Sequence, residues 1–217
     1  MRHCFFFLLL LSPALLPAQR TFRAGLTAGL NGSQVHGDNA SGFDKAGFVG
    51  GGFVCTDPSQ RFYGQMELQY SMKGSRKQAN PNAGDYVSFG IDLDYVEVPF
   101  LLRWNYSGKV KTRFMLELGL TLGALVRAKE YDSFGAIAPK PYSRAEIALA
   151  TGIGIPFGKD QQWVCNLRYT NSIIPVYKFP GGPIFDPRPF FRYFNRGFYN
   201  NVLGLTLQYR FPQKSES

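Results

Sequence analysis

The feature that most constrains the fold is a period-two alternation of large apolar residues with smaller or polar ones. In the stretch NVLGLTLQYRF, residues 201–211, every second residue from Leu203 to Phe211 is large and apolar. Side chains of a strand point alternately to opposite faces, so this pattern predicts a strand with one apolar and one polar face. A soluble barrel would turn the apolar face inward, whereas a membrane barrel would turn it towards lipid.

Repeats of this pattern predict an all-β chain of eight strands. The composition agrees, because 16% of the residues are aromatic and 24 are glycine, and such residues suit strands and turns. The length of 217 residues fits one domain. The predicted strands lie near 21–31, 43–55, 61–72, 90–104, 112–127, 143–156, 162–173 and 198–211.

The opening MRHCFFFLLLLSPALLPAQ predicts a secretory signal peptide, with a basic start, an apolar run and small residues before the cleavage point. The alternative is a membrane anchor, but the run is shorter than the roughly 20 residues that a spanning helix needs. We place cleavage after Ala18 or Gln19. Residues 1–18 are then the signal peptide and residues 19–217 the barrel domain.

The predicted connections alternate in length. The second, fourth and sixth (TDPSQ, NYSGKVK and GKDQQ) are short, whereas the first, third, fifth and seventh are longer. Alternate connections of an up-and-down barrel lie at opposite ends, and outer-membrane barrels have short periplasmic turns and long outer loops. The sorting therefore predicts an antiparallel up-and-down transmembrane barrel in the outer membrane, with both termini periplasmic.

The polar faces of the predicted strands differ from a water-exposed surface. Lysine is absent from the predicted strand middles, where the charges are arginine and glutamate mixed with small residues. Such a mixture can fill the narrow interior of an eight-stranded barrel, as a polar path or as a plug of ion pairs. Arginine outnumbers glutamate, so a water-filled path would prefer anions. The predicted interior network is Arg23, Glu67, Glu97, Arg103, Arg113, Glu117, Arg144, Glu146, Arg168 and Arg210.

Aromatic residues recur at one end of the apolar faces. Six predicted strands each contribute one such residue with lipid-facing parity, all at the periplasmic end. A ring of this kind is typical of the interfacial girdle of membrane barrels. The predicted girdle consists of Phe22, Phe62, Trp104, Phe114, Trp163 and Phe211.

Four stretches resemble a known family: AGLTAGLN, FYGQMELQYSMKGS, LDYVEVPFLLRW and ELGLTLGALV, at 24–31, 62–75, 93–104 and 117–126. With the signal ending in Ala-Gln and the closing YRF, they are similar to the PorT-like outer-membrane β-barrel proteins of Bacteroidota, a porin family. The resemblance spans the mature chain and implies fold and compartment. It implies no activity, because a shared barrel fold does not carry function. The tail PQKSES after Phe211 departs from barrels that end at the terminal aromatic residue.

Little in the sequence suggests catalysis. His36 lies near Asp38 and Asp44, and a His-Asp pair could act as a general base, but a loop histidine is usually solvated. One mature histidine and the separated Cys55 and Cys165 cannot build a zinc site or a disulfide framework. We therefore expect no catalytic residue, no metal site, no cofactor and no bond between the two cysteines.

The connection from about Ile174 to Gly197 is the most unusual segment. Aromatic residues alternate there with arginines, and prolines stiffen the chain. Such residues are enriched at binding hot spots, although the loop could instead bury them over the barrel mouth. The candidate binding residues are Tyr177, Phe179, Arg188, Phe190, Phe191, Arg192, Tyr193, Phe194 and Arg196.

The sequence therefore predicts a small, non-enzymatic outer-membrane barrel with a structural or interaction role, including partnership with a secretion or envelope complex. The alternatives are an anion-preferring channel and an outer-membrane enzyme. Expected partners are outer-membrane lipid, the phosphates of lipopolysaccharide, the barrel-assembly machinery and an envelope protein. Nucleic acid is excluded as a partner of a cell-surface loop, despite the formal charge of +9.

Overall fold

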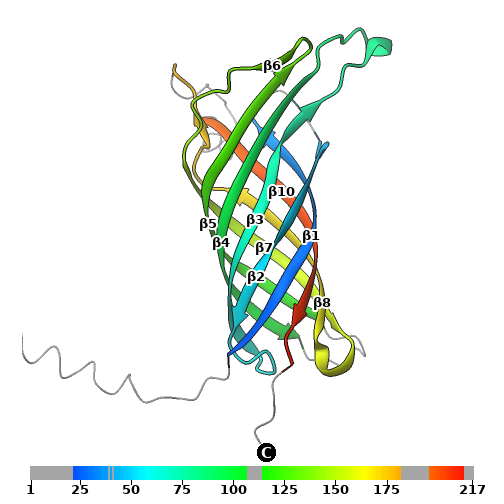
Figure 1. Cartoon of the computed structure of the whole chain (residues 1–217), viewed down its shortest axis with the longest axis vertical. Coiled ribbons are helices and arrows are strands. Elements are labelled where there is room, and N and C mark those ends of the chain that lie inside the picture. The colour runs from blue at the N-terminus through cyan, green and yellow to red at the C-terminus, as the bar shows by residue number, and fades with distance from the viewer. Residues whose placement is uncertain (1–21, 39, 41, 107–113, 182–195, 213–217) are drawn as a thin grey trace, which may run out of the picture.

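The chain folds into one antiparallel sheet that closes on itself (Figure 1). The computed structural model describes residues 22–38, 40, 42–106, 114–181 and 196–212. Each long strand pairs with the next one along the chain, and β1 also pairs with β10. The predicted all-β, up-and-down ring of eight strands is confirmed. The predicted signal peptide lies outside the described residues.

The ring consists of long strands joined by turns, short strands and two 3-10 helices. The short strands are β6 (Gly135–Ile137) and β9 (Tyr177–Lys178), and the helices are Pro81–Ala83 and Lys159–Gln161. No helix in the described ranges is long and apolar enough to cross a membrane. The long strands are β1 (Arg23–His36), β2 (Lys45–Cys55), β3 (Phe62–Lys77), β4 (Phe89–Tyr106), β5 (Phe114–Asp132), β7 (Ala145–Phe157), β8 (Trp163–Ser172) and β10 (Gly197–Arg210).

The main departure from the predicted strands is at the end of the barrel away from the termini. There β1, β3 and β5 continue to His36, Lys77 and Asp132, five residues or so beyond the predicted ends. Their side chains no longer alternate between apolar and polar, but the backbone keeps pairing with neighbouring strands. We call this end the loop end and the other, where β1 begins and β10 finishes, the terminal end.

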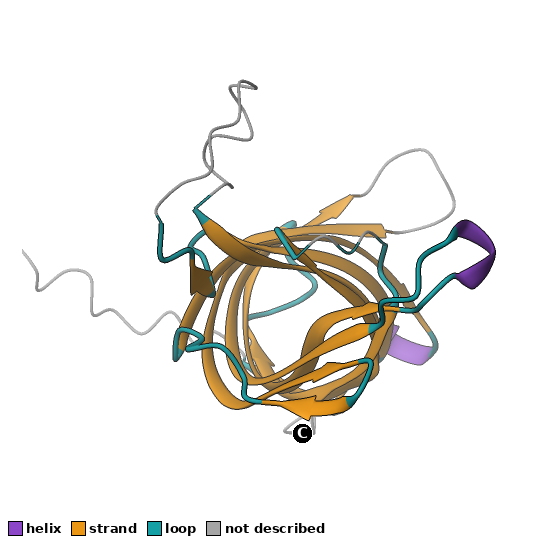
Figure 2. Ribbon diagram, turned by 90° about the horizontal axis from the view of Figure 1, so that it is seen from above, coloured by secondary structure: helices purple, strands orange, loops and turns teal. Residues whose placement is uncertain are grey.

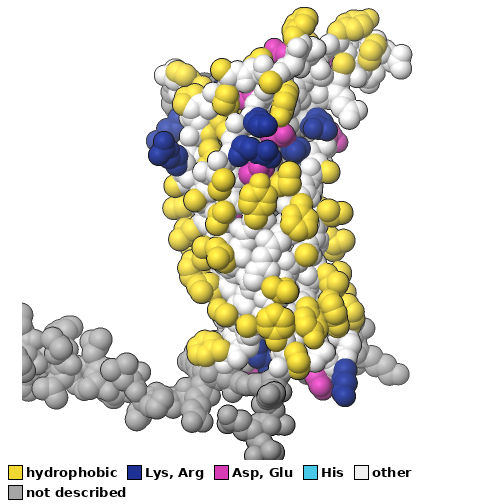
Figure 3. Space-filling model, in the orientation of Figure 1, with side chains coloured by type: hydrophobic (Ala, Val, Ile, Leu, Met, Phe, Trp, Pro, Cys, Tyr) yellow, Lys and Arg dark blue, Asp and Glu magenta, His cyan; other side chains and the backbone are white. Residues whose placement is uncertain are grey.

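The two faces of the wall have opposite character. Along β5, Leu116, Leu118 and Leu120 are exposed, whereas Glu117 and Thr121 are buried. Figure 3 shows apolar side chains around the wall and a group of charged side chains above them, towards the loop end. The apolar face therefore points outward and the polar face inward. The outward direction of the apolar face is the arrangement expected of a membrane barrel and not of a soluble one.

Small residues on the inner face leave room for the large polar ones. A Cβ at Gly152 would lie 2.6 Å from Oε1 of Glu117, and one at Gly154 would overlap the side chain of Met115. Since protein interiors are close-packed, larger residues at these two positions would displace Glu117 and Met115. Glycine is therefore part of what allows an eight-stranded ring to hold glutamate and arginine.

The interior is layered along the barrel axis, which Figure 2 views from above. At the loop end, Val35, Leu93 and Phe198 belong to a buried apolar cluster, which we call the cap. At the terminal end a second buried cluster contains Phe53, Tyr63 and Met115. Buried charged residues lie between the two clusters. The complete buried cap is Val35, Ile91, Leu93, Tyr95, Val176 and Phe198.

Candidate functional site: the barrel interior and its two ends

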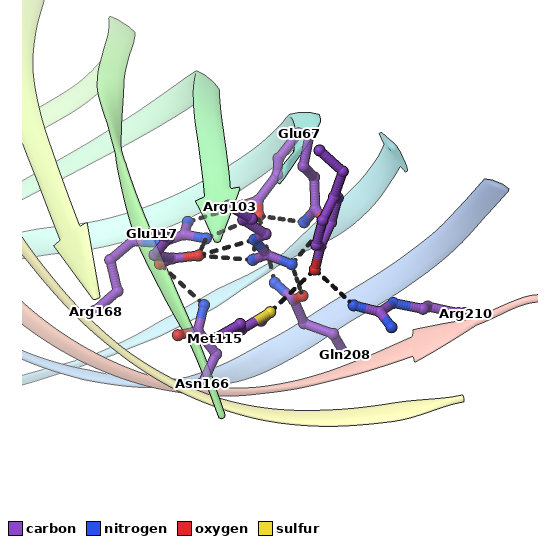
Figure 4. A network of polar contacts seen from close by, with 10 residues as sticks. Glu67, Arg103, Met115, Glu117, Asn166, Arg168, Gln208 and Arg210 are labelled. Atoms are coloured by element: carbon purple, nitrogen blue, oxygen red, sulfur yellow. Dashed lines mark hydrogen bonds and ion pairs between the residues drawn. The ribbon is translucent and has the colours of Figure 1, made fainter. Parts of the chain in front are cut away.

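Two arginines and two glutamates form an ion-pair network nearer the terminal end, which we call the lower network (Figure 4). Arg168 donates from Nη1 and Nη2 to the two carboxylate oxygens of Glu67, both at 2.8 Å. Its Nε donates to Oε1 of Glu117 at 2.6 Å. Arg103 donates from Nε at 3.0 Å and from Nη2 at 2.7 Å to Oε2 of Glu117. Each carboxylate is therefore shared by both arginines or held bidentately.

Amides satisfy the remaining polar atoms of the lower network. Arg103 donates from Nη1 to Gln65 at 2.6 Å and to Gln208 at 2.9 Å. Asn166 donates to Glu117 at 3.0 Å. Arg103 is completely buried and Glu67 is 1% exposed. Buried charges are tolerated only when paired and hydrogen-bonded, and these residues meet both conditions.

A second network, the upper network, lies between the lower network and the cap. The ammonium of Lys73 pairs with Glu97 and with Glu146, the latter at 3.0 Å. Ser172 and Asn200 also donate to Glu146. Lys73 is 1% exposed, and its Nζ lies 5.1 Å from the centre of the Tyr95 ring. The upper network therefore centres on a buried lysine.

The prediction that no lysine lies in the middle of a strand is wrong for Lys73. Lys73 is neither in a loop nor at a strand end, because β3 continues to Lys77. A buried ammonium is costly alone, but two carboxylates from β4 and β7 compensate it. Its inward parity with Glu67 and Gln69 on β3 was the available signal, and the loss of apolar alternation after Met72 concealed it.

These networks cross the barrel instead of following its wall. Arg168 on β8 reaches Glu67 on β3, and Lys73 on β3 reaches Glu146 on β7, yet neither pair of strands is adjacent in the ring. A cavity of about 30 Å³, large enough for a water or two, remains beside Gln69, Lys73 and Arg168. The centre of the barrel is filled by side chains.

The cap closes the loop end above the upper network. The backbone of Val176 donates to the carbonyl of Phe198 at 2.8 Å, and Ser143 donates to the carbonyl of Val176 at 2.7 Å. These bonds hold the chain after β8 across the barrel mouth. Tyr177 and Phe179 pack on the cap, at 5.2 and 5.7 Å between their ring centres and that of Phe198. Apolar side chains therefore cover the charges from the loop end.

The predicted interior residues do not all lie inside the ring. Arg23 is half-buried at the terminal end, and Arg113 lies outside the described residues. The prediction that Arg144 points into the interior is wrong. Its side chain is exposed, because β7 begins only at Ala145 and strand parity does not apply before it. The residues that are buried inside the ring are Glu67, Glu97, Arg103, Glu117, Glu146, Arg168 and Arg210.

The charge balance of the centre differs from the expectation of an arginine excess. With Lys73 added, the two networks contain three cations and four carboxylates. Among the described residues, the two buried or half-buried arginines without a carboxylate partner are Arg23 and Arg210, both at the terminal end. The centre therefore lacks the positive charge from which anion preference was expected. Its members are Lys73, Arg103 and Arg168 with Glu67, Glu97, Glu117 and Glu146.

The predicted aromatic residues lie on the outward face near the terminal end. Phe62 stacks on Trp104 with 6.3 Å between ring centres. Tyr106, which was not predicted, connects Trp104 to Phe114 through ring contacts at 5.9 and 4.6 Å. Tyr209, also not predicted, packs between two others at 4.7 and 5.9 Å. The two neighbours of Tyr209 are the predicted residues Trp163 and Phe211. The remaining predicted residue, Phe22, is 67% exposed.

Most of the predicted outer-loop binding residues cannot be placed. Tyr177 and Phe179 pack on the cap, whereas Arg196 is exposed. The others, Arg188, Phe190, Phe191, Arg192, Tyr193 and Phe194, lie outside the described residues. Exposed apolar residues occur on other loops, where Tyr86 is 71% and Phe134 is 99% exposed. Neither was predicted, because the short apolar stretches in these two connections show no period-two alternation.

The residues considered for catalysis form no evident constellation. His36 acts electrostatically on Asp38, and burial of Asp38 raises its pKa above the ordinary value of 3.8. Cys55 and Cys165 are free thiols, the first buried in the terminal-end cluster and the second exposed on the outer face. In the described part of the chain, no group of three or more His, Cys, Asp or Glu residues could hold a metal ion.

Comparison with known proteins gives one family match and several similar structures. The family model described as "Outer membrane protein beta-barrel domain" matches residues 16–178. No curated protein matches the sequence.

Two of the similar solved structures are bacterial barrels. The attachment invasion locus protein Ail of Yersinia pestis, in complex with the heparin analogue sucrose octasulfate, is 14% identical, with a TM-score of 0.46. The alignment covers 88% of this chain and 99% of Ail. Neisserial surface protein A is 12% identical with a TM-score of 0.44, and the alignment covers 88% of this chain and 97% of that protein.

Proposed function

The chain belongs to the outer membrane protein beta-barrel domain family, and from this premise we propose that it is a sealed, non-enzymatic barrel with a structural or interaction role in the cell envelope. The barrel anchors the chain in the outer membrane and holds its loops in fixed positions. Its interior stabilises the wall and conducts nothing.

The observation that carries this proposal is the bidentate pair of Arg168 with Glu67 across the ring. An eight-stranded barrel is just wide enough for side chains to fill, so such a pair occupies the space through which a solute would pass. The Lys73 pairs and the cap close the same axis at two further levels. Opening a path would require several buried charges to separate at once.

The first alternative, an anion-preferring channel, is less well supported. A conducting pore needs a continuous polar path, and the buried hydrophobic cluster of the cap lies at the loop end of the barrel. The second alternative, an enzyme, would depend on His36 and Asp38. We expect His36→Ala to leave folding and every envelope phenotype of the protein unchanged.

Solute uptake by liposomes tests the sealed barrel. The refolded full-length chain, checked for heat-modifiable migration, is reconstituted at a fixed protein-to-lipid ratio and diluted into small sugars or amino acids. We expect these liposomes to swell no faster than protein-free liposomes. Liposomes with a general porin at the same ratio serve as the positive control. Swelling that rises with the amount of folded barrel would overturn the proposal.

We place the terminal end in the periplasm and the loop end outside the cell. The connections at 56–61, 107–113 and 158–162 are short, and those at 37–44, 78–88, 133–144 and 173–196 are longer, which is the usual asymmetry of such barrels. An epitope tag at Gly84, in a loop-end turn, should react on intact cells. A tag after Pro212 should react only once the outer membrane is permeabilised.

The loop end offers a surface for a protein partner of the envelope. Ser88 and Ser133 hydrogen-bond at 3.0 Å and so join the β3–β4 loop to the β5–β6 turn. Beside this joint, Tyr86, Val87 and Phe134 expose apolar side chains to solvent. Large exposed apolar residues on an ordered loop favour contact with another protein.

Membrane partners are supported by the outer wall. Arg76, Arg127 and Lys129 are exposed on the loop-end parts of β3 and β5. Figure 3 shows a group of charged side chains above the apolar band, towards the loop end. Arginine and lysine at this level can pair with lipid phosphates, including those of lipopolysaccharide. The barrel-assembly machinery is proposed as a partner because the fold needs insertion, and the closing strand ends with Tyr209 and Arg210, directly before the aromatic Phe211.

The narrower assignment to PorT-like barrels of Bacteroidota rests on the resembling stretches alone. These stretches correspond to parts of β1, β3, β4 and β5, so they describe the wall and not a binding site. A role beside a secretion complex would therefore have to come from the loops.

A further inference from the structure

A cavity of about 450 Å³ lies at the terminal end of the barrel, below the second apolar cluster. Its lining comes from the terminal-end parts of β1, β4, β5, β7 and β10 and from connections between strands, including Arg23, Pro58, Tyr106, Gln161 and Arg210. We call it the terminal-end cavity. Its volume is within the usual range of small-molecule sites, roughly 300–1,000 Å³.

Two guanidinium groups line this cavity without a carboxylate partner. Arg210 is 3% exposed and donates only to neutral oxygens: the Tyr63 hydroxyl at 2.8 Å and the Gln161 carbonyl at 3.3 Å. The Nε atoms of both Arg23 and Arg210 are buried without a hydrogen-bond partner. Among the described residues neither arginine forms an ion pair. This contrasts with Arg103 and Arg168, which both pair with glutamate.

The two arginines are also close to each other. Gly25 on β1 pairs in register with Arg210, and Arg23 lies two residues away on the same inner face. Their like charges repel each other. Leaving such a charge unpaired in a partly buried site is costly, so an anion in the cavity would relieve both desolvation and repulsion.

The nearby carboxylates do not replace that anion. Asp57 interacts electrostatically with Arg23, but its Oδ1 accepts from the backbone N–H and the hydroxyl of Ser59 at 2.9 and 2.8 Å. Asp160 also lines the cavity, but among the described residues it forms no ion pair with Arg23 or Arg210. The cavity therefore keeps two donors of positive charge facing a space that is large enough for a ligand.

We propose that the terminal-end cavity binds a phosphate-class dianion through Arg23 and Arg210. A carboxylate has two oxygens, which one guanidinium fork satisfies, whereas a phosphate has enough oxygens for two forks. A double negative charge also balances the two arginines. The phosphate can come from a soluble phosphate monoester or from a lipid whose headgroup is itself a phosphate monoester, such as phosphatidic acid, because both offer three terminal oxygens and a double charge.

Inorganic phosphate titrated into the refolded full-length chain tests this proposal. Calorimetry is carried out in maltoside micelles, which contain no phosphate, with chloride adjusted to keep the ionic strength constant. We expect saturable binding that weakens roughly ten- to hundredfold in Arg23→Gln, the loss of a charged hydrogen-bond donor. Arg23→Lys, which keeps the charge but not the fork, should fall between the two and serves if Arg23→Gln does not fold.

Two arginines outside the cavity are the matched controls. Arg61 lies at the same end over the rings of Phe62 and Trp104, and Arg76 lies on β3 towards the loop end. Arg61→Gln and Arg76→Gln should bind phosphate like the unaltered chain. Absence of saturable binding, or equal affinity in Arg23→Gln and the unaltered chain, would overturn the proposal, and so would an equal loss in Arg61→Gln.

Lipid nanodiscs distinguish the two sources of phosphate. The same titration is made in zwitterionic discs, in discs with phosphatidic acid and in discs with fatty acid of equal charge. If a headgroup is the natural ligand, phosphatidic acid will lower the apparent phosphate affinity more than fatty acid does. If the two anionic discs agree, the ligand comes from solution. Both outcomes support an oxyanion site, and neither depends on whether the barrel conducts.

Discussion

At the scale of single residues, the buried charges of the lower network stabilise the barrel only as pairs. Arg168 donates to Glu67 and Glu117, and Arg103 holds Glu117 from the other side. Breaking a buried pair leaves an uncompensated charge, which costs far more than the net contribution of the pair. Replacing any single member of the lower network by a neutral residue is therefore expected to lower the stability of the barrel strongly.

Arg168→Ala should lower the free energy of unfolding by about 3–5 kcal/mol, because Glu67 loses its bidentate partner inside the barrel. Urea unfolding of the refolded chain in micelles measures this. Arg196→Ala removes an exposed arginine and should change stability by less than about 0.5 kcal/mol.

The double variant Arg168→Ala/Glu67→Ala gives the second check on this network. It should lose less than the sum of the two single changes, because the pair is removed as a unit. Additive losses, or a single loss no larger than that of Arg196→Ala, would contradict the account at this scale.

At the scale of elements, the segments that cover the loop end matter most. The chain after β8 folds back over the barrel, and β9 pairs with the start of β10 through Tyr177 and Phe198. The cap formed there is apolar, whereas the two networks below it are ionic. The cap therefore contributes to stability, and the networks are sufficient to close the axis without it.

Phe198→Ala should lower the free energy of unfolding by about 3–5 kcal/mol, since a buried phenylalanine is replaced by a cavity. It should still conduct no ions, because Lys73, Glu97 and Glu146 remain in place. Phe134→Ala is the matched control, since Phe134 is 99% exposed at the same end. Conductance in Phe198→Ala alone would show that the cap, and not the networks, seals the barrel.

The β3–β4 loop offers a prediction on pH. A hydrogen bond from Lys77, the largest cause, and one from the Val87 N–H hold the pKa of Asp85 below its ordinary value of 3.8. Because this pKa is lowered on folding, the Lys77–Asp85 pair supports the loop above the ordinary value and is lost as pH falls through the lowered one.

Lys77→Gln should raise the pKa of Asp85 part of the way back to 3.8, since the Val87 N–H remains. Carboxyl chemical shifts of Asp85 followed by NMR from pH 2 to pH 6 (roughly the range of a carboxyl titration) measure the change. Lys178→Gln, on β9, should leave the pKa of Asp85 unchanged. An unaltered Asp85 pKa in Lys77→Gln would mean that the pair does not form in solution.

At the scale of the whole molecule, alternation and loop length were enough to predict the ring. Lipid contact selects long apolar side chains at every second position, so Leu116, Leu118 and Leu120 revealed which face is outward. Closure of the ring follows from pairing each strand with the next. These features repeat along the chain and do not depend on which side chains meet inside.

The interior contacts were less accessible to prediction. Parity indicated that Glu67 and Arg168 point inward, but their pairing depends on the stagger and curvature of the ring, which no local pattern encodes. Parity failed at Arg144, which precedes β7, and it was not extended to Lys73 because the predicted strand ended before that residue. The terminal-end cavity combines residues from both ends of the chain, so only the folded ring could bring Arg23 and Arg210 together.

Single-channel recording in planar bilayers tests the central claim most directly. The sample is the refolded full-length chain, shown to be folded by heat-modifiable migration, and the ratio of anion to cation permeability is recorded wherever current flows. The account predicts no current steps at any voltage that the bilayer tolerates, because Arg168, Glu67 and Lys73 occupy the axis. Reproducible steps of fixed size from folded barrels would contradict it and would make the charged interior a path.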